Sequence, residues 1–317
     1  MANCNDEFTQ FLENIQLAKS KIEHLRTSRD ALREKVKTYY KEKKENIPDF
    51  LGQGSFKAHT CINQSDEDYD IDDGVYLQHL PENKDDWPKT ETVHSEIKEA
   101  VKNHTVQPPE DKTACVRVRF KKEYHVDLAI YGEYEEKVYL ARKGTEQWEE
   151  NSPRLFTEWI LDKVDIYGEQ IRNVIKYIKK WAYYNGWIDS ISGFLITILV
   201  GNHFSPSIDR DDLALYNTLM SIASYLRNNR EILRPVKPMK NMTASFSEAE
   251  MDKMISLFEE FRDEAQKAVI EIVKKDAQET WRSLFGNDFP KYNEDEQVDN
   301  SLSISRSRVR ENKPWGK

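Results

Sequence analysis

Hydrophobic residues recur at intervals of three and four positions over residues 11–40, and this spacing predicts one long amphipathic helix. A helix of that length would run roughly 45 Å, long enough to brace two lobes. A coiled coil is the alternative, but Arg29 interrupts its seam and the pattern covers too few heptads. The apolar positions are Phe11, Ile15, Ala18, Ile22, Leu25, Leu32, Val36 and Tyr40.

The next part of the chain has the pattern of strands. Strand-like apolar runs cover 70–77, 114–120 and 125–131, and a helical stretch over 93–103 follows the first of them. Only three charged residues separate the last two runs, which predicts an antiparallel hairpin. From residue 152 onward the pattern is helical, over 153–164, 170–185, 193–203, 211–228 and 247–275, with a final turn around Trp281.

Strands followed by helices predict the α+β class, with two lobes and a cleft between them. We expect residues 1–150 to form a mixed-sheet core that includes the long N-terminal helix, and residues 151–292 to form a helical lobe. The polar segment 293–317, rich in serine and arginine, is predicted to be a flexible tail.

Composition narrows the classes of function. The chain has 47 basic and 56 acidic residues and a net charge of −9. This balance argues against a protein whose whole surface is basic for nucleic-acid binding, but it is compatible with a local basic groove. No apolar run approaches the roughly 20 residues that span a bilayer, and the first residues lack the pattern of a signal peptide. Three widely spaced cysteines predict neither a disulfide framework nor structural zinc. We therefore expect a cytoplasmic protein without membrane association.

Three aspartates carry the candidate chemistry. Asp70 and Asp72 point to the same face of their predicted strand, because side chains alternate along a strand. Asp127 lies inside an apolar run, where a buried carboxylate without a partner would be costly. Converging carboxylates bind hard cations, and Mg²⁺ prefers carboxylates together with substrate phosphates.

A calcium-binding loop and a solvated acidic loop both fit the acidic run less well. A calcium loop counted from Asp68 needs glycine at its sixth position and glutamate at its twelfth, where this chain has Asp73 and His79. A solvated acidic loop accounts for 65–68, but not for the strand pattern that surrounds Asp70 and Asp72.

Phosphate-binding groups are predicted on both sides of these acids. In the segment 52–57, Gly54 lets backbone amides approach a phosphate and Ser55 adds a hydroxyl, although such glycine pairs also occur in ordinary turns. On the predicted helix 170–185, Lys179 flanks the apolar stripe and can reach a cleft, whereas Lys176 and Lys180 are expected on the solvated surface. Together these features predict a two-metal nucleotidyl-transfer site.

Other catalytic classes are not indicated. His59, His125 and His203 are not paired by spacing and are interpreted as structural or incidental. The chain contains neither a P-loop motif nor a suggestive Ser/His/Asp order.

These residues resemble the polymerase-β nucleotidyltransferase superfamily and, more narrowly, the cGAS/DncV-like nucleotidyltransferases (CD-NTases) of bacterial CBASS anti-phage systems. The similarity extends from the long N-terminal helix to about residue 290, with Arg234 at a late turn where the family often has aspartate. The matching segments are 52–60, 115–118, 125–127, 175–181, 191–195, 234–238 and 281–290.

The resemblance implies a two-lobed fold and a synthase that joins nucleoside triphosphates, with release of pyrophosphate, into cyclic di- or trinucleotide second messengers. Asp70 and Asp72 would hold two Mg²⁺ ions, which Mn²⁺ can replace, and Asp127 would complete the ion that activates the attacking hydroxyl. Gly54, Ser55, Lys179 and Ser192 would bind the donor triphosphate.

The same resemblance implies regulatory or effector-operon protein partners, and no requirement for a membrane or for a stable nucleic-acid duplex. Two alternatives stay open. One is a template-independent polymerase that makes linear oligonucleotides, which would need a basic track for the growing strand. The other is a non-catalytic adaptor, against which the three intact acids count.

Overall fold

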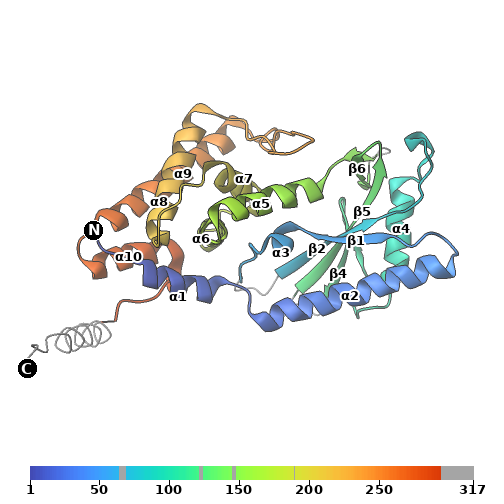
Figure 1. Ribbon diagram of the computed structural model, residues 1–317, viewed down its shortest axis with the longest axis horizontal. Coiled ribbons are helices and arrows are strands. Elements are labelled where there is room, and N and C mark those ends of the chain that lie inside the picture. Colours follow the sequence, from blue (N-terminus) through green and yellow to red (C-terminus); the bar gives the residue numbers. More distant parts are fainter. Residues whose placement is uncertain (64–68, 121–123, 145–147, 189, 294–317) are drawn as a thin grey trace, which may run out of the picture.

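The computed structural model describes residues 1–63, 69–120, 124–144, 148–188 and 190–293. The segment 65–68, the turn of the predicted hairpin at 121–123, and residues 294–317 of the predicted tail 293–317 lie outside the described residues. The described chain is an α+β structure in which a sheet occupies one part of the molecule and a group of helices the other (Figure 1).

The sheet has seven strands, and its centre is the parallel pair β2 and β5. The main path runs β1–β2–β5–β4–β3, and β6 pairs with β5 and with β7. The hairpin predicted from the sequence is confirmed, because β4 pairs antiparallel with β5. The strands are β1 Asp49–Gln53, β2 Tyr69–Tyr76, β3 Glu110–Asp111, β4 Val116–Phe120, β5 Tyr124–Tyr134, β6 Lys137–Leu140 and β7 Glu149–Glu150.

Two helices, α2 (Lys19–Glu42) and α4 (Thr90–Val101), cover one face of this sheet. Leu25 and Leu32 of α2 belong to the same buried cluster as Ile71 and Val75 of β2. Because side chains alternate along β2, Asp70 and Asp72 project from the opposite face. The apolar positions of the strand thus fix the direction of its carboxylates.

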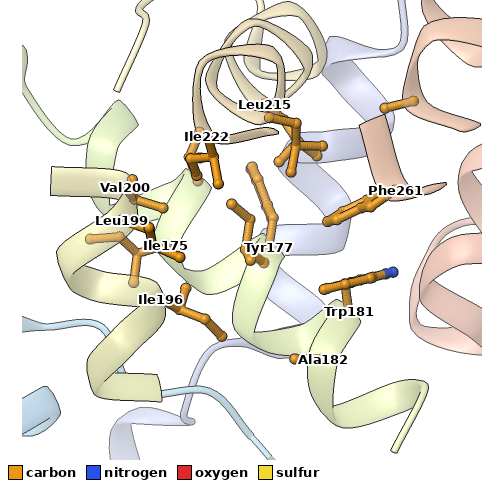
Figure 2. Packing of buried hydrophobic residues seen from close by; sticks show 14 of the residues in the cluster. Ile175, Tyr177, Trp181, Ala182, Ile196, Leu199, Val200, Leu215, Ile222 and Phe261 are labelled. Carbon is orange, nitrogen blue, oxygen red and sulfur yellow. The ribbon is translucent and has the colours of Figure 1, made fainter. Parts of the chain in front are cut away.

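The helical lobe surrounds α6, whose apolar side chains are almost completely buried. Figure 2 shows Ile175, Tyr177 and Trp181 of α6 among side chains of neighbouring helices, including Leu199 and Phe261. The helices of this lobe are α1 Asn5–Ile15, α5 Pro153–Tyr167, α6 Gln170–Tyr184, α7 Gly193–His203, α8 Asp211–Asn228, α9 Glu248–Ile270 and α10 Lys274–Phe285. Among the described residues, two 3₁₀ turns, η1 Lys84–Asp86 and η2 Gly286–Asp288, are the remaining elements outside the site.

The prediction of one unbroken helix over 11–40 is wrong. The chain leaves the helical conformation at Gln16, which is extended and bridges to Ile62, and the N–H of Asn63 donates to the Ile15 carbonyl at 2.6 Å. The reason is that the two halves pack on different cores. α1 belongs to the helical lobe and α2 lies along the sheet.

The prediction for 247–275 is wrong in the same way, because α9 ends at Ile270 and α10 begins at Lys274. At this break the carboxylate of Glu271 accepts hydrogen bonds from the N–H groups of Ile272 and Val273, at 2.7 and 3.0 Å. These bonds favour a new helix start over continuation.

Phe8 anchors α1 in the helical lobe and gives a test of this packing. Its ring is fully buried, with ring centroids 5.0 Å from those of both Tyr177 and Trp281. We expect Phe8→Ala to lower the free energy of unfolding by about 3–5 kcal/mol in urea titrations, because it leaves a cavity. Ile272→Ala, at an 81% exposed side chain, should change it by less than about 0.5 kcal/mol. Equal effects of the two substitutions would contradict the packing.

Candidate active site

The pairing of β2 with β5 places the three predicted aspartates together. In the parallel register Asp72 lies beside Asp127, and Asp70 lies beside His125. Ligand atoms of Asp70, His125 and Asp127 all lie within 4.8 Å of one another. The three predicted acids therefore form one cluster on one face of the sheet, and His125 joins it.

Electrostatic repulsion and burial act on this cluster. Burial is the main cause that raises the pKa of Asp70; the charge of Asp127 adds to the shift, while His125 opposes it. The pKa of Asp72 lies well above its usual value because of burial first, and then because of the negative charges of Asp70 and Asp127. Such a site takes up positive charge, either protons or a bound cation, and three carboxylates suit a hard divalent cation.

Two arginines each bind one aspartate of the sheet, and the two pairs lie on opposite faces. Arg117 of β4 binds both oxygens of Asp127, with distances of 2.9 and 2.8 Å. On the opposite face, the Nε of Arg33 in α2 donates to Asp73 at 2.7 Å, and a second bond from the same guanidinium completes the pair. Each carboxylate oxygen has two lone pairs, so Asp127 keeps acceptor capacity beyond its bonds to Arg117.

The acids face a cleft of about 790 Å³ between the two lobes. Asp70 and Asp72 line it, together with Gly54, Ser55 and Lys179. Asp127 is buried behind this lining, next to Asp72. Residues of the sheet and of α5, α6 and α7 thus meet around one cavity.

The predicted Gly-Ser turn is the short helix α3 (Gly54–Ala58), which follows β1 directly. Gly54 has φ +67°, and a Cβ on it would lie only 2.0 Å from the Oδ2 of Asp72. The Oγ of Ser55 lies 3.1 Å from the sulfur of Cys61, whose pKa is raised to about 11 by burial. Glycine is required here because the carboxylate of Asp72 fills the space where a side chain would be.

Residues 48–131 match a family model for the nucleotidyltransferase domain of DncV-like cyclic GMP-AMP synthases. The match includes the Gly-Ser segment and all three aspartates of the cluster.

Solved structures share the whole fold. A structure of Vibrio cholerae DncV, a cyclic AMP-GMP synthase, matches with a TM-score of 0.76 and 17% identity, over 91% of this chain and 98% of that one. A structure of E. coli MS115-1 CdnC with ATP matches with a TM-score of 0.72 and 18% identity, over 91% and 99%. The two-lobed, polymerase-β-like fold expected from the sequence is confirmed.

Lys179 lies where the sequence predicted, in the cleft. Its side chain is 7% exposed, its Nζ donates to the carbonyl and the Oγ1 of Thr60 at 3.2 Å, and burial lowers its pKa. An ammonium has three N–H donors, so one is left for a ligand.

The neighbouring lysines correct the prediction of a solvated surface. Lys180 is 4% exposed and forms an ion pair with Asp288 of η2 at 2.6 Å, so it joins α6 to the end of the helical lobe. Lys176 is half-buried, and burial lowers its pKa. Helix geometry alone did not show that η2 approaches this face of α6.

Ser192 caps helix α7. Its hydroxyl oxygen accepts the N–H of Leu195 at 3.2 Å, and its proton is left to be donated. The cleft lining includes its neighbours Gly193 and Phe194. A phosphate contact by Ser192 therefore stays a prediction.

Sequence reasoning missed His125 and Arg117. His125 precedes Asp127 by two positions and therefore shares its face of β5, a signal that was present in the sequence. Arg117 lies opposite Asp127 in the hairpin register. Finding it requires the register, which the spacing of the two runs does not set alone.

No helix in the part of the chain that the structure describes is long and apolar enough to cross a membrane.

Gly54 gives a test of the close approach to Asp72. We expect Gly54→Ala to destabilise the protein by about 1–2 kcal/mol or more through its positive φ. We also expect Mg²⁺ to raise the melting temperature of the parent protein and not that of Gly54→Ala, because the new methyl group displaces Asp72. Gly168→Ala is the matched control: its φ is +72° and nothing lies within 4 Å of an added Cβ. The idea fails if Mg²⁺ still stabilises Gly54→Ala as it does the parent protein.

The raised pKa of Asp72 gives a pH-dependent prediction. Because its pKa is higher in the folded than in the unfolded protein, metal-free stability falls as pH rises from the ordinary carboxyl range through the folded value. Asp72→Asn removes this penalty, so in EDTA it should melt above the parent at neutral pH, and the difference should shrink toward pH 5. Melting curves from pH 5 to 8 measure this, and a parent that melts higher than the variant throughout would refute it.

Proposed function

We propose that this protein is a divalent-metal-dependent nucleotidyltransferase that joins nucleoside triphosphates into a cyclic di- or trinucleotide. One observation carries the proposal: Asp70, Asp72 and Asp127 converge on adjacent strands beside a cleft that Ser55 and Lys179 also line. Acids, a hydroxyl and an ammonium around one cavity are the groups that nucleotidyl transfer from a triphosphate needs.

The acidic cluster fits divalent cations. Its carboxylates are partly or fully buried and repel one another, and bound positive charge relieves that repulsion. Asp70 and Asp72 would hold two ions, of which Asp127 would complete one. When bound, these ions would lower the pKa of the attacking ribose hydroxyl and stabilise charge on the leaving pyrophosphate. Mg²⁺ is the proposed metal, and Mn²⁺ a substitute.

The remaining groups position the donor nucleotide. The ammonium of Lys179 places a positive charge in the cleft. The hydroxyl of Ser55 adds a hydrogen-bond donor, and it lies near Asp72 because the preceding residue, Gly54, packs against that carboxylate. We place the triphosphate between these two groups, with Ser192 contributing from the start of α7.

Cyclisation is supported by the fold relatives. DncV is described as a cyclic AMP-GMP synthase and has been seen with the linear intermediate 5′ pppA(3′,5′)pG, and CdnC has been seen with ATP. A linear intermediate that re-docks in the same cleft would give a ring. We therefore favour a cyclic product over a linear oligonucleotide for this chain.

The biological role is proposed on the same basis. CdnC has been seen in complex with HORMA-deltaN, which supports a protein partner for this chain as well. We propose that the product is a second messenger of cytoplasmic anti-phage defence, and that no membrane or nucleic-acid duplex takes part in its synthesis.

The test is incubation of the purified protein with four radiolabelled nucleoside triphosphates and Mg²⁺ or Mn²⁺, followed by phosphatase treatment and chromatography. We expect a phosphatase-resistant product from the parent, and at least a 100-fold lower yield from Asp70→Asn/Asp72→Asn, because loss of electrostatic stabilisation of this kind costs about 10²–10³ in rate. Asp85→Asn/Asp86→Asn, a pair of exposed aspartates on η1, is the matched control and should retain activity.

Other outcomes select the alternatives. A ladder of phosphatase-sensitive products would favour a template-independent polymerase. Absence of product under all conditions, with nucleotide binding unaffected by the double substitution, would favour a non-catalytic adaptor.

A further inference from the structure

Arg234 has unused hydrogen-bond donors in the wall of the nucleotide cleft. It lies on the segment between α8 and α9, is 5% exposed and lines the cavity. Its Nη1 donates to Asn151 at 2.9 Å, and its Nη2 donates to the carbonyl of Ser152. Its Nε is buried and has no hydrogen-bond partner among the described residues. Nη1 and Nη2 each carry a second N–H beyond these bonds, so the guanidinium has donors available to a ligand in the cleft.

The charge of Arg234 is also unbalanced. The two other arginine and lysine side chains that line this part of the cleft, Arg142 and Lys240, both pair with Glu149. Within the described part of the chain Arg234 forms no ion pair, and burial lowers its pKa, although a guanidinium stays charged in proteins. Its two hydrogen bonds attach the segment between α8 and α9 to Asn151 and Ser152, where the chain passes from the sheet to the helical lobe. This structural role does not use the Nε, which has no partner among the described residues.

The position of Arg234 corresponds to the base of a nucleotide rather than to its reacting phosphate. Arg234 is bonded to Asn151 and Ser152, which directly follow β7. β7 pairs with β6, and β6 pairs with β5 at Tyr131, which follows Asp127 by four residues on the same face of β5. Four residues of strand span roughly 13 Å. A nucleotide whose hydroxyl or phosphate lies at the acids would therefore extend its base toward Arg234.

The surroundings also favour a base over a second phosphate group. Phe156 of α5 and Phe194 of α7 line the same cleft with ring centroids 4.3 Å apart, and Met242 adds further apolar surface. Aromatic side chains are stacking platforms for bases. A triphosphate would need several uncompensated cations, and Arg234 is a single one.

We propose that Arg234 selects guanine, by donating the remaining N–H of Nη1 and of Nη2 to the O6 and N7 acceptors on one edge of the base. This assignment rests on the proposed function, since it names the base that the same cleft accepts. Adenine has an amino group in place of O6, so its N–H donors would meet the N–H donors of the guanidinium without forming a hydrogen bond. Glutamine, which offers one donor and one acceptor, matches adenine instead.

The experiment measures dissociation constants of non-hydrolysable GTP and ATP analogues by calorimetry, for the parent protein, Arg234→Gln and Arg234→Met. We expect the parent to prefer the GTP analogue by roughly 5- to 100-fold, Arg234→Met to lose this preference and Arg234→Gln to shift it toward ATP. Arg142→Gln, in the same cleft, removes one positive charge and should keep the ratio of the two constants. Because binding needs no catalysis, the result is independent of whether a cyclic product forms.

Three outcomes would overturn the assignment. If Arg234→Gln leaves the ratio of the two dissociation constants unchanged and lowers the melting temperature, the role of the residue is only structural. Equal weakening of both analogues and of inorganic triphosphate would mean that it binds phosphate. A parent protein without preference for guanine would exclude base selection by Arg234.

Discussion

The parallel pairing between β2 and β5 is the constraint on which the rest of the structure depends. It sets Asp72 beside Asp127 and Asp70 beside His125, so like charges meet at close range in a partly buried place. Their repulsion is tolerated because each strand has an apolar opposite face packed under α2 and α4. The core on one face of the sheet thus holds the site on the other face in a configuration that it would not adopt alone.

Two arginines offset part of the negative charge of the aspartates on β2 and β5. Arg117 and Arg33 bind Asp127 and Asp73 through two bonds each, from opposite faces of the sheet. A planar guanidinium is suited to this because it fixes both oxygens of a carboxylate at once. Asp70 and Asp72 are left without such a partner among the described residues, and they are the ones that line the cleft. The arginine partners therefore separate the two carboxylates that line the cleft from the two that lie behind its lining.

Much of the site could be predicted from local pattern. The period of two along 70–77 gave the common face of Asp70 and Asp72, and the flank position of Lys179 on α6 gave its place in the cleft. Partners distant in the sequence could not be predicted. The burial of Lys180 depends on Asp288, more than a hundred residues away, and the bond to Arg117 depends on strand register.

The helix break at Gln16 was missed for a different reason. Both halves keep the same helical period, so the sequence pattern is continuous although the two apolar stripes belong to different cores. Periodicity reports that a face is buried, but not what buries it. The fold class and the clustering of the acids could therefore be predicted from the sequence, but the division of the N-terminal segment between the lobes could not.

That break changes how the lobes are connected. The backbone passes from the helical lobe to the sheet between α1 and α2, and it returns between β7 and α5. Hydrogen bonds join the lobes between these crossings as well: Lys179 donates to Thr60, and Arg172 donates to the carbonyl of Ala58. The position of Lys179 relative to the acids is therefore set by contacts between the lobes and not by helix α6 alone.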